Sequence, residues 1–114
     1  FVAARIGVPQ TRHLALTAAR FKGPEALRLG IVHYLAKDAA GLDAKLEEVL
    51  KQVDRCAPLA NALTKAIVMK VGSEPLSSVL DFAADCFAEA RRSPEAAEGL
   101  RAFAEKRPPK WATE

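Results

Sequence analysis

The sequence predicts a mainly α-helical chain that contains one short strand. Three observations support this prediction. From residue 41 onwards, apolar residues recur at intervals of three and four, the spacing of one face of an α-helix. Prolines stand where helices would begin and glycines where they would end, and only residues 31–35 form a run of β-favouring side chains. At 114 residues, the chain is one domain at most, or part of one.

Two helical patterns occupy the start of the chain. Gly7 and Pro9 divide residues 1–20 into a short helix and a longer one, because proline suits a first helical position. In the segment FKGPEALRLG, Pro24 takes such a position, and Gly30 can adopt the left-handed conformation that ends a helix. We therefore expect a helix of under two turns before Gly30.

The run IVHYL at residues 31–35 is the expected strand. A lone strand leaves its backbone N–H and C=O groups unpaired unless another sheet supplies partners. We expect these partners to be missing from the sequence given. The first residue, Phe1, is also not a start methionine, which is consistent with a processed or truncated chain.

Three helical patterns follow. The first covers residues 41–56, with one apolar and one charged face. Pro58 begins the second, Gly72 ends it, and Pro75 begins the third. The third helix has an apolar stripe too wide for one shallow contact, so we expect this helix to pack on two partners. The stripe consists of Leu76, Val79, Leu80, Phe82, Ala83, Cys86 and Phe87.

The last helix is expected to start at Ser93, an N-cap residue, with Pro94 at the first helical position. It should end near Arg107, because Pro108 cannot continue a helix.

Composition and charge exclude several classes of protein. Half of the residues are hydrophobic and the formal net charge is only +3, as in an ordinary globular domain, so we expect no nucleic-acid partner. Cys56 and Cys86 lie 30 residues apart without a zinc-ligand spacing and are expected in the core. No apolar run approaches a membrane span and no signal peptide is visible, so we expect no membrane partner and a cytoplasmic location.

No catalytic or metal-binding motif is present. His13 and His33 lack HExxH spacing, and the serines lack a GxSxG context. Glu25 could act as a general base, but its place just inside a helix start explains it. We therefore assign no catalytic residue and no metal ligand.

The segment FAEKRPPKW, residues 103–111, combines an aromatic residue with cations. On a helix, Lys106 and Arg107 would be the i+3 and i+4 neighbours of Phe103, so an adenine nucleotide could stack on the ring while its phosphates meet the cations. The alternative is that Phe103 belongs to the core and the cations merely end a helix, where its dipole favours them. Composition alone favours this alternative.

The ordered segments ALTAARFKGPEALRLGIVHYL, CAPLANALTKAIV and SPEAAEGLRAFAEKRPPKW resemble the C-terminal portion of the enoyl-CoA hydratase/isomerase family, the crotonases. In that family, a spiral of ββα turns supplies the oxyanion hole and the catalytic glutamates, and these elements lie upstream of Phe1. The resemblance implies that residues 1–36 end this α/β core, with its last short strand, and that residues 37–114 form the helical region that builds the trimer.

The resemblance also implies a function. The expected reaction is hydration of a trans-2-enoyl-CoA to a 3-hydroxyacyl-CoA, or a related step through a thioester enolate, in fatty acid metabolism. The expected partners are an acyl-CoA thioester and further copies in a trimer or a dimer of trimers. No cofactor is expected beyond the coenzyme A of the substrate. Because the catalytic elements lie upstream, we expect this chain to be inactive by itself.

Two binding residues follow from the resemblance. In hydratases of the family, the phenylalanine and lysine of an F-x-x-K pair approach the adenine and 3′-phosphate end of coenzyme A, and Phe103 and Lys106 occupy these positions.

The rival hypothesis is that the chain is a self-contained helical oligomerisation module without activity. The absence of a catalytic constellation in the sequence favours this hypothesis.

Overall fold

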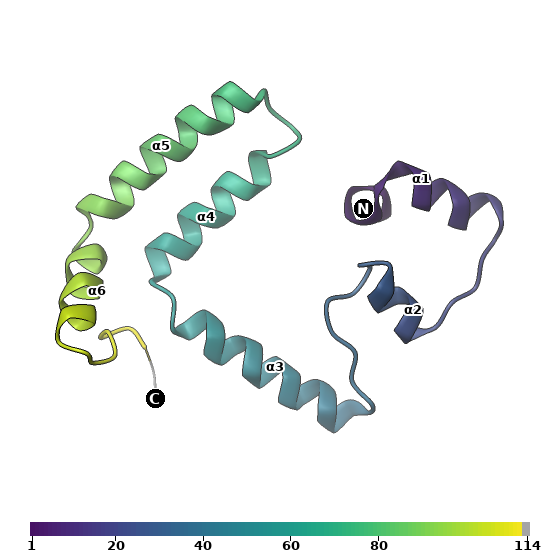
Figure 1. The fold of residues 1–114 in the computed structure, drawn as a ribbon, viewed down its shortest axis with the longest axis horizontal. Coiled ribbons are helices and arrows are strands. Elements are labelled where there is room, and N and C mark those ends of the chain that lie inside the picture. The colour runs from purple at the N-terminus through teal and green to yellow at the C-terminus, as the bar shows by residue number, and fades with distance from the viewer. Residues whose placement is uncertain (113–114) are drawn as a thin grey trace. The chain divides into compact units, whose positions relative to one another are not determined.

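A computed structural model describes residues 1–112, and within them the chain forms six α-helices and no strand (Figure 1). The mainly helical expectation is confirmed. The helices are α1 (Val2–Leu16), α2 (Gly23–Arg28), α3 (Ala39–Asp54), α4 (Pro58–Lys70), α5 (Leu76–Arg92) and α6 (Pro94–Ala104).

The chain divides into two compact units, the first covering Phe1–Glu47 and the second beginning at Glu48. The boundary expected after residue 36 refers to the complete fold and stays a prediction. Within residues 1–112, none of the helices combines the length and hydropathy that a membrane crossing requires.

In the first unit, Gly7 interrupts α1. Its φ of 78° and ψ of 161° are not helical, so α1 consists of two helical segments, as the sequence predicts. The second helix, α2, ends in a Schellman motif, a helix end closed by two backbone hydrogen bonds around a left-handed residue. The Gly30 N–H donates to Leu27 O at 3.0 Å and the Ile31 N–H to Ala26 O at 2.9 Å, with Gly30 at φ 78°.

The strand expected at residues 31–35 is not formed in the part of the chain that the structure describes. The N–H groups of Ile31 and Val32 both donate back to Ala26 O, at 2.9 and 3.4 Å, so the end of α2 uses the donors that a strand ladder would need. Without a partner strand, the rest of the run has nothing to pair with. The β propensity of these side chains is therefore insufficient to define a strand.

In the second unit, α4 packs on α5 and α5 on α6. The helices α4 and α5 lie side by side and are joined by a short loop (Figure 1). The Lys70 Nζ at the end of α4 lies 4.7 Å from the centre of the Phe82 ring of α5, a contact that joins the two helices near this loop. The same Nζ lies 2.7 Å from Glu74 Oε1 in the loop itself. Three residues between positions 48 and 112 are buried, and all are small or medium in size: Val79, Cys86 and Ala102.

A glutamate of α6 caps the start of α4. The N-cap residue of α4 is Ala57, whose side chain has no acceptor. Glu95 fills this role from a distance, since its Oε2 accepts a hydrogen bond from the Leu59 N–H at 2.9 Å. The interaction places an anion at the positive end of the α4 dipole and ties α6 to α4.

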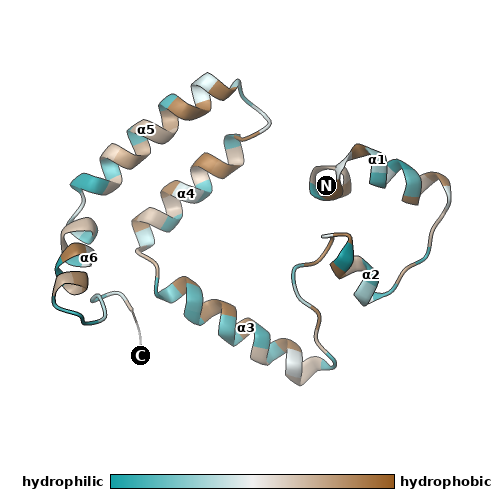
Figure 2. Cartoon of the chain, in the orientation of Figure 1, coloured by the Kyte–Doolittle hydropathy of each residue, from teal (hydrophilic) through white to brown (hydrophobic). Residues whose placement is uncertain are grey.

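Much apolar surface remains exposed on the helices. Figure 2 shows hydrophobic residues, in brown, recurring along helices that also carry hydrophilic ones. On α3, the predicted apolar face is about half exposed, with Leu42, Leu46 and Val53 at 58, 54 and 50 %. Of the stripe on α5, Val79 and Cys86 are buried, whereas Leu76 and Phe87 are 73 and 68 % exposed. Cys56, expected in the core, is exposed.

Candidate functional site

The predicted binding residues Phe103 and Lys106 lie where α6 ends. The last helical residue is Ala104, so the expectation of a helix that continues to about Arg107 and is stopped by Pro108 is wrong. The helix closes in a second Schellman motif: the Lys106 N–H donates to Phe103 O at 3.2 Å, and the Arg107 N–H donates to Ala102 O at 3.0 Å. Backbone hydrogen bonds, and not the later proline, terminate the helix.

Lys106 occupies the left-handed position of this motif, with φ 54°. The same position at the end of α2 holds Gly30, the residue type that adopts this conformation without steric cost. A side chain there brings its Cβ close to the backbone and costs roughly 1–2 kcal/mol. Lys106 is therefore held in a conformation that its side chain disfavours.

Both predicted residues face solvent. Phe103 is 85 % exposed, and Lys106 is also exposed and forms no ion pair within residues 1–112. The interpretation of Phe103 as a core residue is therefore wrong for this chain. Because Lys106 lies beyond the helix, the expected i,i+3 and i,i+4 spacing does not apply, but the Lys106 N–H to Phe103 O bond keeps the two backbones adjacent.

Arg107 is engaged within the chain. Its Nη1 donates to Glu98 Oε1 at 2.7 Å and its Nη2 to Glu98 Oε2 at 3.3 Å, a bidentate pair, while its Nε donates to Glu105 Oε2 at 2.6 Å. The hydrogen bond to Glu98 foremost, with that to Glu105, raises the pKa of the guanidinium. Arg107 is thus occupied by carboxylates, whereas Lys106 forms no ion pair within residues 1–112 and can meet a ligand beside Phe103.

Glu98 is the centre of this arrangement. Besides Arg107, it accepts the backbone N–H of Lys110 at 3.1 Å, and its side chain is only 13 % exposed. The hydrogen bond from Arg107 first, and that from Lys110 next, hold the pKa of Glu98 below its usual range, so it is a carboxylate at neutral pH.

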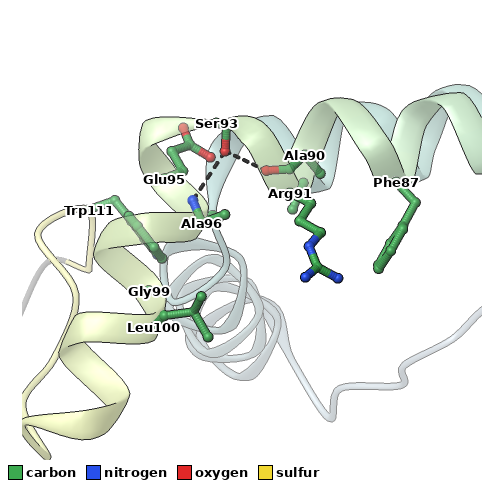
Figure 3. A pocket seen from close by; sticks show the side chains of 11 residues that line it. Phe87, Ala90, Arg91, Ser93, Glu95, Ala96, Gly99, Leu100 and Trp111 are labelled. Atoms are coloured by element: carbon green, nitrogen blue, oxygen red, sulfur yellow. Dashed lines mark hydrogen bonds between the residues drawn. The ribbon is translucent and has the colours of Figure 1, made fainter.

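The chain after α6 then folds back onto the second unit. The indole Nε1 of Trp111 donates to Arg55 O at 3.3 Å, just after α3. The ring lies against Gly99, where a Cβ would meet Trp111 Cη2 at 3.2 Å (Figure 3). Glycine at this position is thus what lets the ring approach the helix.

An open groove of about 610 Å³ lies beside Trp111. Its walls are largely apolar, with Phe87 from α5, Leu100 from α6 and Trp111 among them, and Arg91 at one side (Figure 3). At its edge, the Ser93 hydroxyl donates to Ala90 O at 2.7 Å and accepts the Ala96 N–H at 3.1 Å, which confirms Ser93 as the cap of α6.

The other candidates have structural surroundings. Glu25 forms a hydrogen bond with Arg28 Nε at 2.7 Å, and this contact above all lowers the pKa of Glu25, so the carboxylate is a poor base. His33 Nε2 lies 3.2 Å from Arg5 Nη1. Across residues 1–112, no group of three His, Cys, Asp or Glu side chains could hold a metal ion.

Sequence reasoning missed the roles of Glu98 and Trp111. Glu98 and Arg107 are nine residues apart, a spacing that no local helix rule connects, and the contact of Trp111 with Arg55 spans 56 residues. The available signal was the pair of prolines after Arg107, which indicates a change of chain direction.

Comparison with known proteins identifies the family. The family model for enoyl-CoA hydratase/isomerase matches residues 1–114. The chain belongs to the enoyl-CoA hydratase/isomerase family.

Solved structures of this family share the fold. The chain superposes on Pseudomonas aeruginosa AtuE with a TM-score of 0.91 and 54 % identity, covering 98 % of this chain and 43 % of that one. For an enoyl-CoA hydratase/isomerase from Marinobacter aquaeolei, the TM-score is 0.89 and the identity 48 %, over 98 % of this chain and 42 % of that one.

A curated relative is the carnitinyl-CoA dehydratase of Citrobacter koseri, which is 33 % identical over 102 residues, 86 % of this chain and 39 % of the relative. The chain thus spans less than half the length of each of these proteins. The resemblance read from the sequence is confirmed, and the chain corresponds to a helical, C-terminal portion of the family fold.

Proposed function

We propose that this chain is the C-terminal part of an enzyme that acts on acyl-CoA thioesters, by hydration of a trans-2-enoyl-CoA to the 3-hydroxyacyl-CoA or by a related thioester-enolate step. Family membership over residues 1–114 supports this proposal. The oxyanion hole and catalytic glutamates belong to the upstream core, so the chain is inactive by itself and contributes binding and assembly. We also propose that the enzyme works in cytoplasmic fatty acid metabolism without a further cofactor.

Phe103 and Lys106 contact the nucleotide end of coenzyme A in this proposal. The observation that carries it is the strained, exposed Lys106 beside an aromatic ring that is 85 % exposed. Non-glycine residues persist in such backbone conformations where the surrounding structure imposes them, and they cluster at binding sites. The ring offers adenine a stacking face, and the ammonium offers a phosphate a charge-assisted hydrogen bond.

Steady-state kinetics of the intact protein test this role. Lys106→Ala should raise KM for an enoyl-CoA and leave kcat nearly unchanged, because the ammonium binds ground and transition states alike. The loss of one charged hydrogen bond at a partly wet site amounts to about 1–2 kcal/mol. Lys110→Ala, which removes a charge from an exposed position on the same segment, is the control and should leave KM unchanged. An unchanged KM with a collapsed kcat in Lys106→Ala would overturn the assignment.

The second proposed role is assembly into a trimer or a dimer of trimers. On α5, Leu76, Leu80 and Phe87 are 73, 59 and 68 % exposed and form an apolar surface that a neighbouring subunit can cover.

Sedimentation of the intact protein tests the assembly role. Leu80→Glu should shift the protein to a smaller species, whereas Asp81→Asn on the same helix should not. A wild-type protein that sediments as a monomer would contradict the proposal. The rival, an oligomerisation module without activity, predicts that the Leu80→Glu result is obtained but that Lys106→Ala changes no binding constant.

A further inference from the structure

Three donors converge on the Glu98 carboxylate from the chain beyond Lys106. Two come from the Arg107 guanidinium, at 2.7 and 3.3 Å, and one from the Lys110 N–H, at 3.1 Å. Hydrogen bonds of this charged, bidentate kind fix direction as well as distance. Glu98 therefore holds two points of the segment that follows Lys106.

The residues before Lys106 are fixed by α6. Ala102, one turn after Glu98 on the same face, is only 2 % exposed, and its carbonyl accepts the Arg107 N–H at 3.0 Å. The returning segment thus covers the Glu98 and Ala102 face, while Leu100 and Phe103 remain 72 and 85 % exposed. Lys106 lies at the reversal between a helix end and a segment that Glu98 anchors.

Trp111 adds a third anchor, through its hydrogen bond to Arg55 O and its contact with Gly99 (Figure 3). A disfavoured φ persists only where surrounding contacts impose it. The contacts of Glu98, Ala102 and Trp111 hold the chain on either side of Lys106, in addition to the Lys106 N–H to Phe103 O hydrogen bond and the Glu105–Arg107 ion pair beside it.

We propose that Glu98 is a positioning residue for ligand binding: it does not touch coenzyme A but, through Arg107 and the Lys110 amide, keeps Lys106 in its left-handed conformation with its ammonium directed to the ligand. This inference rests on the proposed contact of Lys106 with coenzyme A. It also explains the role of Arg107, whose cation serves Glu98 and leaves the ligand to Lys106.

The test compares Glu98→Gln, Glu105→Gln and Lys106→Gly in the intact protein, with KM and kcat for an enoyl-CoA and the Kd of free coenzyme A by calorimetry. Glu98→Gln keeps the shape of the side chain and loses the charged pair. We expect KM and Kd to rise about threefold to tenfold and kcat to change less than twofold. Glu105, whose side chain is 52 % exposed and within residues 1–112 pairs with Arg107 alone, is the matched control and should show less than a twofold change.

A double-mutant cycle separates positioning from stability. If Glu98 acts through Lys106, then Glu98→Gln added to Lys106→Gly should raise KM no further. Equal, additive increases in both backgrounds would overturn the proposal. If Glu98→Gln does not fold at the assay temperature, Arg107→Lys replaces it in the test, because lysine keeps the positive charge but cannot form the bidentate pair. Arg107→Lys should then raise KM threefold to tenfold and leave kcat within twofold of the wild-type value.

The outcomes distinguish this inference from the proposed function. A rise of KM in Lys106→Gly with none in Glu98→Gln would reject the positioning role and leave the coenzyme A contact standing. No change of KM in Lys106→Gly would reject the contact itself.

Discussion

Replacement of Lys106 by glycine separates the structural from the binding role of this residue. At φ 54°, a Cβ costs roughly 1–2 kcal/mol, and glycine removes that cost. The greater freedom of glycine in the unfolded chain offsets about 0.5–1 kcal/mol of this gain. The Schellman hydrogen bonds are made by backbone atoms and stay in place. Lys106→Gly should therefore raise stability by about 0–1.5 kcal/mol, a shift of at most a few degrees upward in Tm.

The same substitution should weaken binding. If the ammonium contributes about 1–2 kcal/mol to coenzyme A binding, its loss raises KM about 5-fold to 30-fold. Thermal melting and steady-state kinetics of the same preparation measure both effects. A variant that is as stable as the wild type, yet binds more weakly, cannot be explained by damage to the fold.

Gly30→Ala, in the Schellman motif at the end of α2, measures what a side chain costs at the left-handed position that Lys106 occupies after α6. Gly30 has φ 78°, and no atom lies within 4 Å of an added Cβ, so the substitution adds backbone strain without a clash. It should lower stability by about 1 kcal/mol. A Lys106→Gly variant whose Tm is several degrees lower would contradict backbone strain at this position, and one whose KM and Kd for coenzyme A stay at their wild-type values would contradict the binding role of the ammonium.

Three further predictions concern the contacts that shape the second unit. The pKa of Glu98 is lowered in the folded chain, so its contribution to stability is fully present above the unfolded glutamate pKa of about 4.3. This contribution is lost as the pH falls through the lower, folded pKa. The Tm measured from pH 6 to pH 2 should therefore fall less steeply in Glu98→Gln than in the wild type. Glu95→Ala removes the cap on the Leu59 N–H and should lower the free energy of unfolding by about 1 kcal/mol in urea titrations, whereas Glu89→Ala, at an exposed position of α5, should not. Gly99→Ala places a Cβ 3.2 Å from Trp111 Cη2 and should displace the indole, seen as a red shift of fluorescence that Trp111→Phe abolishes; an unshifted spectrum would contradict this packing.

Local signals in the sequence determined where most helices begin. Pro58 and Pro94 both stand at first helical positions, and Ser93 caps α6 through its own side chain. Gly30 ends α2 in the left-handed conformation, and Gly7 interrupts α1. These outcomes follow from the sequence because each depends on atoms within one turn of the residue concerned. The family could also be recognised from the order of its motifs.

Other features of the chain depend on contacts between residues far apart in the sequence, and only the tertiary structure decided them. Residues 31–35 have β-favouring side chains but no strand, because a strand needs a partner. Glu95 lies where its own helix dipole favours it, yet its oxygen caps α4. The end of α6 at Ala104 and the left-handed Lys106 accompany the return of the chain to Glu98 and Gly99. Sequence spacing could bring Phe103 and Lys106 together as candidates, but only the fold shows that Arg107 is taken by carboxylates and that Lys106 is not.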